Sequence, residues 1–193
     1  ASATTDSGFG NNGVSGKGSS KYEGNSNCRT SYSYSGEVYN DVYYTTAYYE
    51  RSVVAIRASD GRCLAKYYLG GYPYNMTINQ STGILKVGHS GGFKTINLRN
   101  NQQYNCNVQT NLRYSYGTTV SGNYIYYYRS NRIYRAQLSS GTGCPFYNSN
   151  TNFYYPEGSY VGLEANPNNS MELWTLSCDY RSNVKNLSYP EPN

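Results

Sequence analysis

The chain has 193 residues, and tyrosine (26), asparagine (24), serine (24) and glycine (20) make up almost half of it. Charged residues amount to 14%, which is too few for a soluble coiled coil, and the abundance of tyrosine argues against a disordered chain. Lysine and arginine exceed aspartate and glutamate by 16 to 11, but they are scattered singly along the sequence, so nucleic acid is not an expected partner.

The N-terminal segment, residues 1–27, is rich in Gly, Ser and Asn and lacks the alternation of apolar and polar residues seen later in the chain. We expect it to be an arm that adds a strand to a neighbouring molecule, with Phe9 and Val14 as its anchors. A disordered terminus is the alternative.

The first residues, Ala1-Ser2-Ala3, resemble the start of a mature chain after removal of a signal peptide. The longest aliphatic stretch, Val53 to Ile56, is far shorter than the roughly 20 residues that cross a bilayer. We therefore expect a secreted protein, extracellular or at the cell surface, without membrane insertion.

From residue 28 to residue 193 we expect a single all-β repeat domain. Apolar and polar side chains alternate, and turns rich in Gly, Asn and Ser separate short strands, most clearly in residues 76–98 and 118–147. Successive copies are 40, 40 and 39 residues apart if four positions are equivalent: Ile56, Ile96, Ala136 and Thr175. The prediction is an antiparallel meander with almost no helix.

A period of about 40 residues with four short strands in each copy resembles that of β-propeller blades. The resemblance covers roughly residues 37–180 and is carried by Gly122 to Tyr127, Ile133 to Leu138 and their shifted copies. It is a resemblance of pattern, because the Trp-Asp mark of WD40 repeats is absent: the one tryptophan, Trp174, is followed by Thr175. It implies blades, five of them if the two termini share one. A β-sandwich is the alternative architecture.

Five cysteines lie at positions 28, 63, 106, 144 and 178, without the spacing of a zinc site. Equivalent positions on neighbouring blades usually lie beyond the roughly 7 Å between Cα atoms that a disulfide allows. The propeller therefore predicts mostly free, buried thiols, and two intrachain disulfides would favour the sandwich instead.

Catalytic chemistry has few candidates. His89 is the one histidine and follows Gly88 near a glycine-rich turn, so we expect a solvated loop residue. Glu164 and Glu172 are expected to be charges on a strand face rather than a catalytic pair. No cofactor motif occurs. We predict no catalytic, cofactor-binding or metal-binding residue, no cofactor, and no enzymatic activity.

Four sequons place candidate glycosylation sites in or beside predicted turns, at Asn75, Asn79, Asn168 and Asn186.

Tyrosine runs within strands put rings on both faces, which predicts an aromatic surface. The candidates are Tyr126, Tyr127, Tyr128, Tyr154 and Tyr155.

We expect a secreted, non-enzymatic structural protein that self-assembles into an extracellular fibre, a pilus-like appendage or a surface coat, with copies of itself as partners. The alternative is a lectin-like, carbohydrate-binding β-propeller. The turns of successive repeats share no set of polar and aromatic residues, which favours the structural protein.

Overall fold

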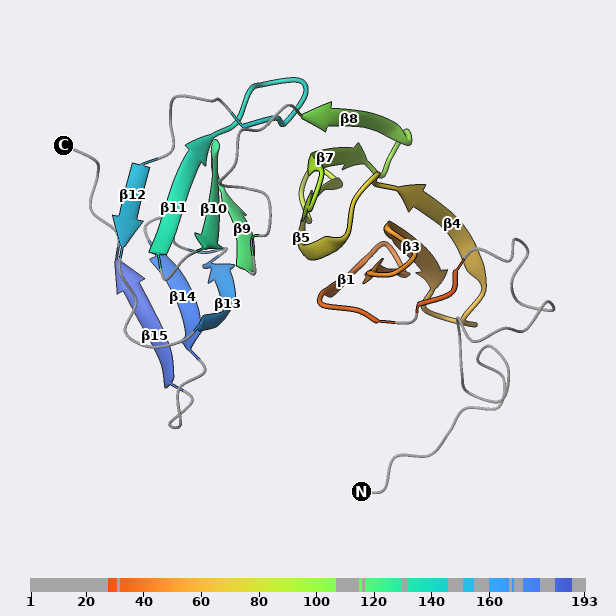
Figure 1. Cartoon of the computed structure of the whole chain (residues 1–193), viewed down its shortest axis with the longest axis horizontal. Helices are drawn as coiled ribbons and strands as arrows, with labels where there is room; N and C mark the ends of the chain where they lie inside the picture. Colours follow the sequence, from red (N-terminus) through yellow and green to blue (C-terminus); the bar gives the residue numbers. More distant parts are fainter. Residues whose placement is uncertain are drawn as a thin grey trace. The chain divides into compact units, whose positions relative to one another are not determined.

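Figure 1 shows the computed structural model of the chain. It describes residues 28–30, 32–106, 115, 117–129, 132–145, 151–154, 160–166, 168, 172–177 and 183–188. For residues 132, 151–154, 160–162, 175–177 and 183–188 it describes the backbone alone. The chain divides into two compact units, unit 1 (Ala1–Tyr74) and unit 2 (Asn75–Asn193). The predicted arm, with Phe9 and Val14, lies outside the described residues, so its boundary with the repeat domain stays a prediction.

Unit 1 contains one antiparallel sheet, in which the strands follow the chain order. The strands are β1 (Gly36–Tyr39), β2 (Val42–Ala47), β3 (Ser52–Arg57) and β4 (Cys63–Tyr68). The hairpin between β1 and β2 has a two-residue loop, Asn40-Asp41, in which both residues have a positive φ. Such a loop matches the right-handed twist of the strands, and Asn and Asp tolerate its backbone conformation.

Three further sheets follow (Figure 1). The second sheet contains β5 (Pro73–Asn79), β6 (Ile84–His89), β7 (Gly92–Asn97) and β8 (Gln102–Cys106). The third contains β9 (Gly117–Ser121), β10 (Tyr124–Arg129), β11 (Arg132–Gln137) and β12 (Thr151–Tyr154). The last contains β13 (Tyr160–Ala165), β14 (Glu172–Ser177) and β15 (Asn183–Ser188). No helix occurs among the described residues, which confirms the all-β prediction.

The register of the strands confirms the predicted repeat in the first three sheets. In each sheet the fifth residue of the third strand lies opposite the second residue of the second strand. These pairs are Ile56 with Tyr43, Ile96 with Leu85, and Ala136 with Ile125. The fourth predicted equivalent, Thr175, lies in β14, the middle strand of the three-stranded sheet. Thr175 therefore lies in the second of the described strands of its sheet, whereas the other three residues lie in the third strand of theirs.

Strand β10 lies between two hydrophobic clusters, and this placement corrects the prediction that its tyrosines form a surface. Tyr127 packs in a cluster with Phe93 of β7, whereas Tyr126 and Tyr128 pack in another with Leu163 of β13. The rings of Tyr126, Tyr127 and Tyr128 are 1%, 0% and 5% exposed. Alternation places them on opposite faces of the strand, as predicted, but both faces are covered. Burial raises the pKa of Tyr127 and of Tyr128.

Two disulfides, Cys28–Cys63 and Cys106–Cys144, overturn the prediction of mostly free thiols. That prediction treated the cysteines as equivalent positions of successive repeats. In the structure Cys63 begins β4, Cys106 ends β8 and Cys144 follows β11, so their regular spacing is not the repeat itself. Each bonded pair has Cα atoms 5.6 Å apart. Disulfides and blades are thus compatible, and the sandwich is not required. Cys178 lies outside the described residues.

Membrane insertion by a helix has no support in the part of the chain that the structure describes, since nothing there forms a helix of the length and apolarity needed to cross a bilayer.

Candidate functional site

Exposed aromatic rings gather at one place in unit 1, where three pairs of tyrosines lie at or beside strand ends. We call this group the tyrosine surface; it consists of Tyr32, Tyr34, Tyr48, Tyr49, Tyr72 and Tyr74. The first pair precedes β1, the second follows β2, and the third flanks the start of β5. Tyr32, Tyr34 and Tyr49 are 51%, 46% and 66% exposed. Tyrosine is enriched in contact surfaces relative to the rest of a protein surface.

Tyr48 is the centre of the tyrosine surface. Its ring stacks on that of Tyr72, with centroids 4.9 Å apart and planes at 26°. It meets the rings of Tyr34 and Tyr49 edge to face, at 5.5 Å and 5.2 Å. Stacked and edge-to-face pairs stabilise each other beyond the area that they bury. The rings therefore support one another and hold the group in place.

Arg51 brings a positive charge to these rings. Its guanidinium donates a hydrogen bond of 3.0 Å to the Tyr72 hydroxyl and lies 4.6 Å from the centroid of the same ring. The hydrogen bond to Tyr72, together with one to Tyr68, raises the pKa of Arg51. The cation is thus part of the aromatic group, which it joins through a cation–π contact.

The tyrosine surface was missed by the sequence analysis, which selected runs within strands. The backbone of Tyr154 lies in β12, but its side chain and all of Tyr155 are outside the described part of the chain, so both stay predictions. The signal that identifies the tyrosine surface is different: paired tyrosines lie in the segments that enter or leave strands rather than in the middle of strands.

The four predicted glycosylation sites differ in their surroundings. Asn75 lies within β5 rather than in a turn, and its Oδ1 accepts a hydrogen bond from the Thr118 amide. Asn79 ends the same strand, and its Oδ1 accepts hydrogen bonds from the amides of the following turn. Asn168 is exposed. Asn186 lies in β15, where the backbone alone is described. Among the three sites whose side chains are described, Asn168 therefore has the most open surroundings.

The predicted absence of catalytic groups is untested, but two placements can be reported. His89 is 6% exposed at the end of β6, and its Nδ1 accepts a hydrogen bond from the Gly91 amide. The prediction that His89 is a solvated loop residue is therefore wrong. Glu164 is exposed on β13 and pairs in register with Trp174, not with Glu172. Glu172 accepts a hydrogen bond of 2.6 Å from the Asn166 side chain. Among the described residues no group of three or more His, Cys, Asp or Glu could hold a metal ion.

Comparison with known proteins gives a fold and no family. No protein-family model matches the chain, and no curated protein matches its sequence. The computationally designed Ika4 protein is similar in structure, with a TM-score of 0.57 and 11% identity over 82% of this chain and 91% of that chain. Hydrazine synthase of Kuenenia stuttgartiensis has a TM-score of 0.58 and 13% identity over 81% of this chain. The computationally designed Ika8 protein has a TM-score of 0.52 and 10% identity, also over 81%.

These likenesses confirm a β-propeller type of repeat protein, as the sequence pattern predicts. The chain spans about half the length of the hydrazine synthase and Ika8 chains, 46% and 45%. At identities this low the fold is shared and nothing follows about activity.

The two disulfides indicate an oxidising compartment, extracellular or periplasmic, because cytosolic thiols are kept reduced.

Proposed function

We propose that the chain is a secreted, non-enzymatic structural protein that self-assembles into an extracellular fibre, a pilus-like appendage or a surface coat. Copies associate through the tyrosine surface of unit 1, with the N-terminal arm as a second contact. The observation that carries the proposal is the tyrosine surface itself, in which exposed rings are held together by their own stacking.

The chemistry of this surface favours a second copy of the chain as the occupant. Tyrosine rings and hydroxyls are complementary to other tyrosine rings and hydroxyls, so one patch can serve both sides of a two-fold contact. Large aromatic residues also contribute most of the binding free energy in interfaces. Arg51 lies against the Tyr72 ring, so its guanidinium is held within the surface.

The area of the surface sets its share of the contact. A buried tyrosine removes about 150–250 Å² from water, so the exposed halves of Tyr32, Tyr34 and Tyr49 offer on the order of 300 Å². A standard interface buries about 800 Å² on each partner. The tyrosine surface therefore acts as the anchor of a larger contact, to which the arm adds main-chain hydrogen bonds.

The lectin-like alternative, with one equivalent sugar site in each repeat, has less support. The residue that follows the second strand of the sheet is Tyr48 in the first repeat and Ser90 in the second. The central ring of the tyrosine surface thus has no counterpart in the next repeat. A multivalent lectin keeps the same binding residues in its copies, whereas a contact between subunits needs them once.

Sedimentation velocity over a range of concentrations, with electron microscopy of the same samples, tests the proposal. Wild-type protein is expected to form oligomers or filaments. The double variant Tyr32→Ser/Tyr49→Ser removes two exposed rings and is expected to shift the distribution to monomer. Tyr43→Ser is the matched control, because Tyr43 is 40% exposed on β2 and is outside the tyrosine surface. Wild-type protein that stays monomeric at millimolar concentration, or a double variant that assembles like wild type, would refute the proposal.

A further inference from the structure

A cavity of about 680 Å³ lies in unit 2, and one face of the second sheet forms its floor. Lys86 of β6 and Thr95 of β7 are opposite each other in register, so their side chains share this face. Tyr104 of β8 pairs with Thr95 and lies on the same face. The loop from Ser139 to Gly143, which follows β11, forms a wall of the cavity. The volume is within the range of about 300–1,000 Å³ that is usual for ligand sites.

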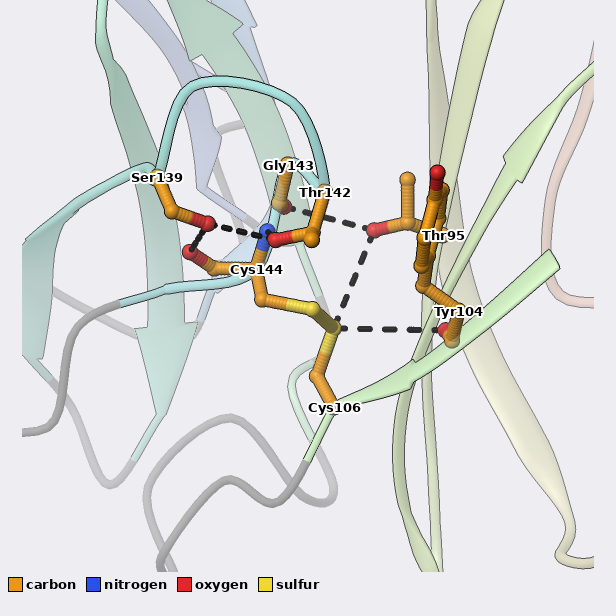
Figure 2. Close-up of a disulfide and its surroundings, with 7 residues drawn as sticks. All are labelled: Thr95, Tyr104, Cys106, Ser139, Thr142, Gly143 and Cys144. Atoms are coloured by element: carbon orange, nitrogen blue, oxygen red, sulfur yellow. Dashed lines mark hydrogen bonds between the residues drawn. A yellow bond between two sulfur atoms is a disulfide. The ribbon is translucent and has the colours of Figure 1, made fainter. Parts of the chain in front are cut away.

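The loop that forms this wall is fixed to the sheet by covalent and hydrogen bonds (Figure 2). The disulfide ties Cys144, at the end of the loop, to Cys106 at the end of β8. The Thr95 hydroxyl donates a hydrogen bond of 3.3 Å to the Gly143 carbonyl. Within the loop the Ser139 hydroxyl donates to the Cys144 carbonyl at 3.0 Å. The wall is therefore held in place before any ligand arrives, which lowers the entropic cost of binding.

Lys86 brings a positive charge to this cavity. Its side chain is 4% exposed, and a Cβ built on Gly143 would lie 3.6 Å from Nζ, so the ammonium is close to the loop. No hydrogen bond or ion pair joins the Lys86 ammonium to any residue that the structure describes, and none of the described residues that line the cavity has a carboxylate. Desolvation lowers the pKa of Lys86 to about 8, so the group is still mostly protonated at neutral pH.

The rest of the lining, among the described residues, is uncharged and combines polar with apolar groups. It includes five amide side chains: Asn79, Asn97, Gln102, Asn123 and Gln137. The Oδ1 atoms of Asn79 and Asn97 accept hydrogen bonds from the turns that follow β5 and β7. Their side-chain N–H groups are thus the donors left for a ligand. Five serine and threonine residues add hydroxyl groups, and three aliphatic side chains complete the lining with glycine and Tyr104.

We propose that this cavity binds an acidic saccharide, with a uronic acid carboxylate on the Lys86 ammonium and the sugar hydroxyls on the surrounding amides and hydroxyls. A hydroxylated ligand suits groups that both donate and accept hydrogen bonds, and one carboxylate matches one ammonium. The proposal goes beyond the proposed self-association, since this cavity is in unit 2 and uses none of the tyrosine surface.

Other classes of ligand fit this lining less well. A nucleotide needs several cations or a row of backbone amides for its phosphates, and Lys86 is the one cation among the described lining residues. A lipid chain would leave the Lys86 ammonium and the amide and hydroxyl groups of ten lining residues without hydrogen-bond partners from the ligand. A metal cation would be repelled by the ammonium.

The test is calorimetric titration of the full chain at pH 7 with a tetrasaccharide of galacturonic acid. The tetrasaccharide of galactose with the same linkage serves as the neutral counterpart, and an oligoglutamate peptide supplies carboxylates without a sugar. We expect binding of the galacturonate and at least tenfold weaker binding of both controls. Lys86→Gln should lower the galacturonate affinity at least tenfold. Lys94→Gln should leave it within twofold of wild type, because Lys94 is also buried but lies on the opposite face of the same sheet.

The pH dependence adds a second readout. Lys86 and Tyr104 are the titratable groups that line the cavity among the described residues. The wild-type affinity should fall as the pH rises through about 8, approaching tenfold for each further pH unit, as the ammonium of the free protein loses its proton. Lys86→Met, which keeps the length of the side chain, should show weak binding without this fall. Equal affinity for the neutral sugar or for the peptide, full affinity in either Lys86 variant, or no binding of galacturonate at millimolar concentration would overturn the proposal.

Discussion

Replacing Lys86 by methionine is expected to stabilise unit 2 at neutral pH, and the gain is expected to disappear at alkaline pH. Methionine has a similar length and no charge, so it fills the same space without the cost of desolvating an ammonium. The pKa of Lys86 falls from the ordinary 10.5 to about 8 in the folded protein. Each pKa unit corresponds to 1.36 kcal/mol, so the cost of burying the charge is about 3 kcal/mol.

The sign follows from proton binding in the two states. Below pH 8 the folded and unfolded states both hold the Lys86 proton, and wild type bears the full cost. Between about pH 8 and 10.5 the unfolded state binds more protons than the folded state, so the free energy of unfolding rises with pH in wild type. The variant lacks this rise. Its advantage over wild type of about 3 kcal/mol at pH 7 should therefore shrink toward zero near pH 10.5.

Urea unfolding followed by tryptophan fluorescence measures this difference. The single tryptophan, Trp174, lies in β14 of unit 2 and reports on the unit that contains Lys86. The titration of tyrosine affects wild type and variant alike, so it cancels in the difference between them. A difference that stays constant from pH 7 to pH 10, or that is absent at pH 7, would show that Lys86 is not desolvated and would refute the reasoning.

Three further predictions concern the disulfide, the buried tyrosines and the arm. Replacing Cys106 and Cys144 by serine should lower the free energy of unfolding by about 4 kcal/mol, since the bond closes a loop with a separation of 38 residues; an unchanged urea midpoint would contradict this. Burial raises the pKa of Tyr44 to about 12, so stability should fall between pH 10 and 12, where the unfolded state loses its proton first, and Tyr44→Phe should show a smaller fall in thermal unfolding. Deleting residues 1–24 should leave a folded monomer in sedimentation; a truncated chain that forms the same oligomer would disprove the arm.

The repeat could be predicted from the sequence because local alternation encodes it. Ile56, Ile96 and Ala136 occupy the same place in three successive sheets, and their spacing of 40 residues is visible in the sequence alone. Alternation also separates Tyr126 from Tyr127 correctly. It does not tell whether another sheet covers a given face, and that decides whether these rings form a core or a surface.

The candidate sites depend on contacts between segments far apart in the sequence, so they could not be predicted in the same way. Lys86 stands in a strand where alternation would assign it to a solvent face, and the loop near Gly143 that covers it comes more than 50 residues later. The spacing of the cysteines is close to the length of the repeat and wrongly suggested that they occupy equivalent positions. Cys63 is the first residue of β4, whereas Cys106 is the last residue of β8.

The bond between Cys106 and Cys144 also determines how unit 2 carries mechanical load. In a repeat protein each sheet usually holds the next through noncovalent contacts alone, so tension separates the sheets one at a time. Here the bond joins the last strand of the second sheet to the segment after β11 of the third. Tension along the backbone then passes through the sulfur atoms and bypasses residues 107–143. If the copies form a fibre, β9, β10 and β11 stay unloaded when it is stretched, and chemical reduction would make the fibre more extensible.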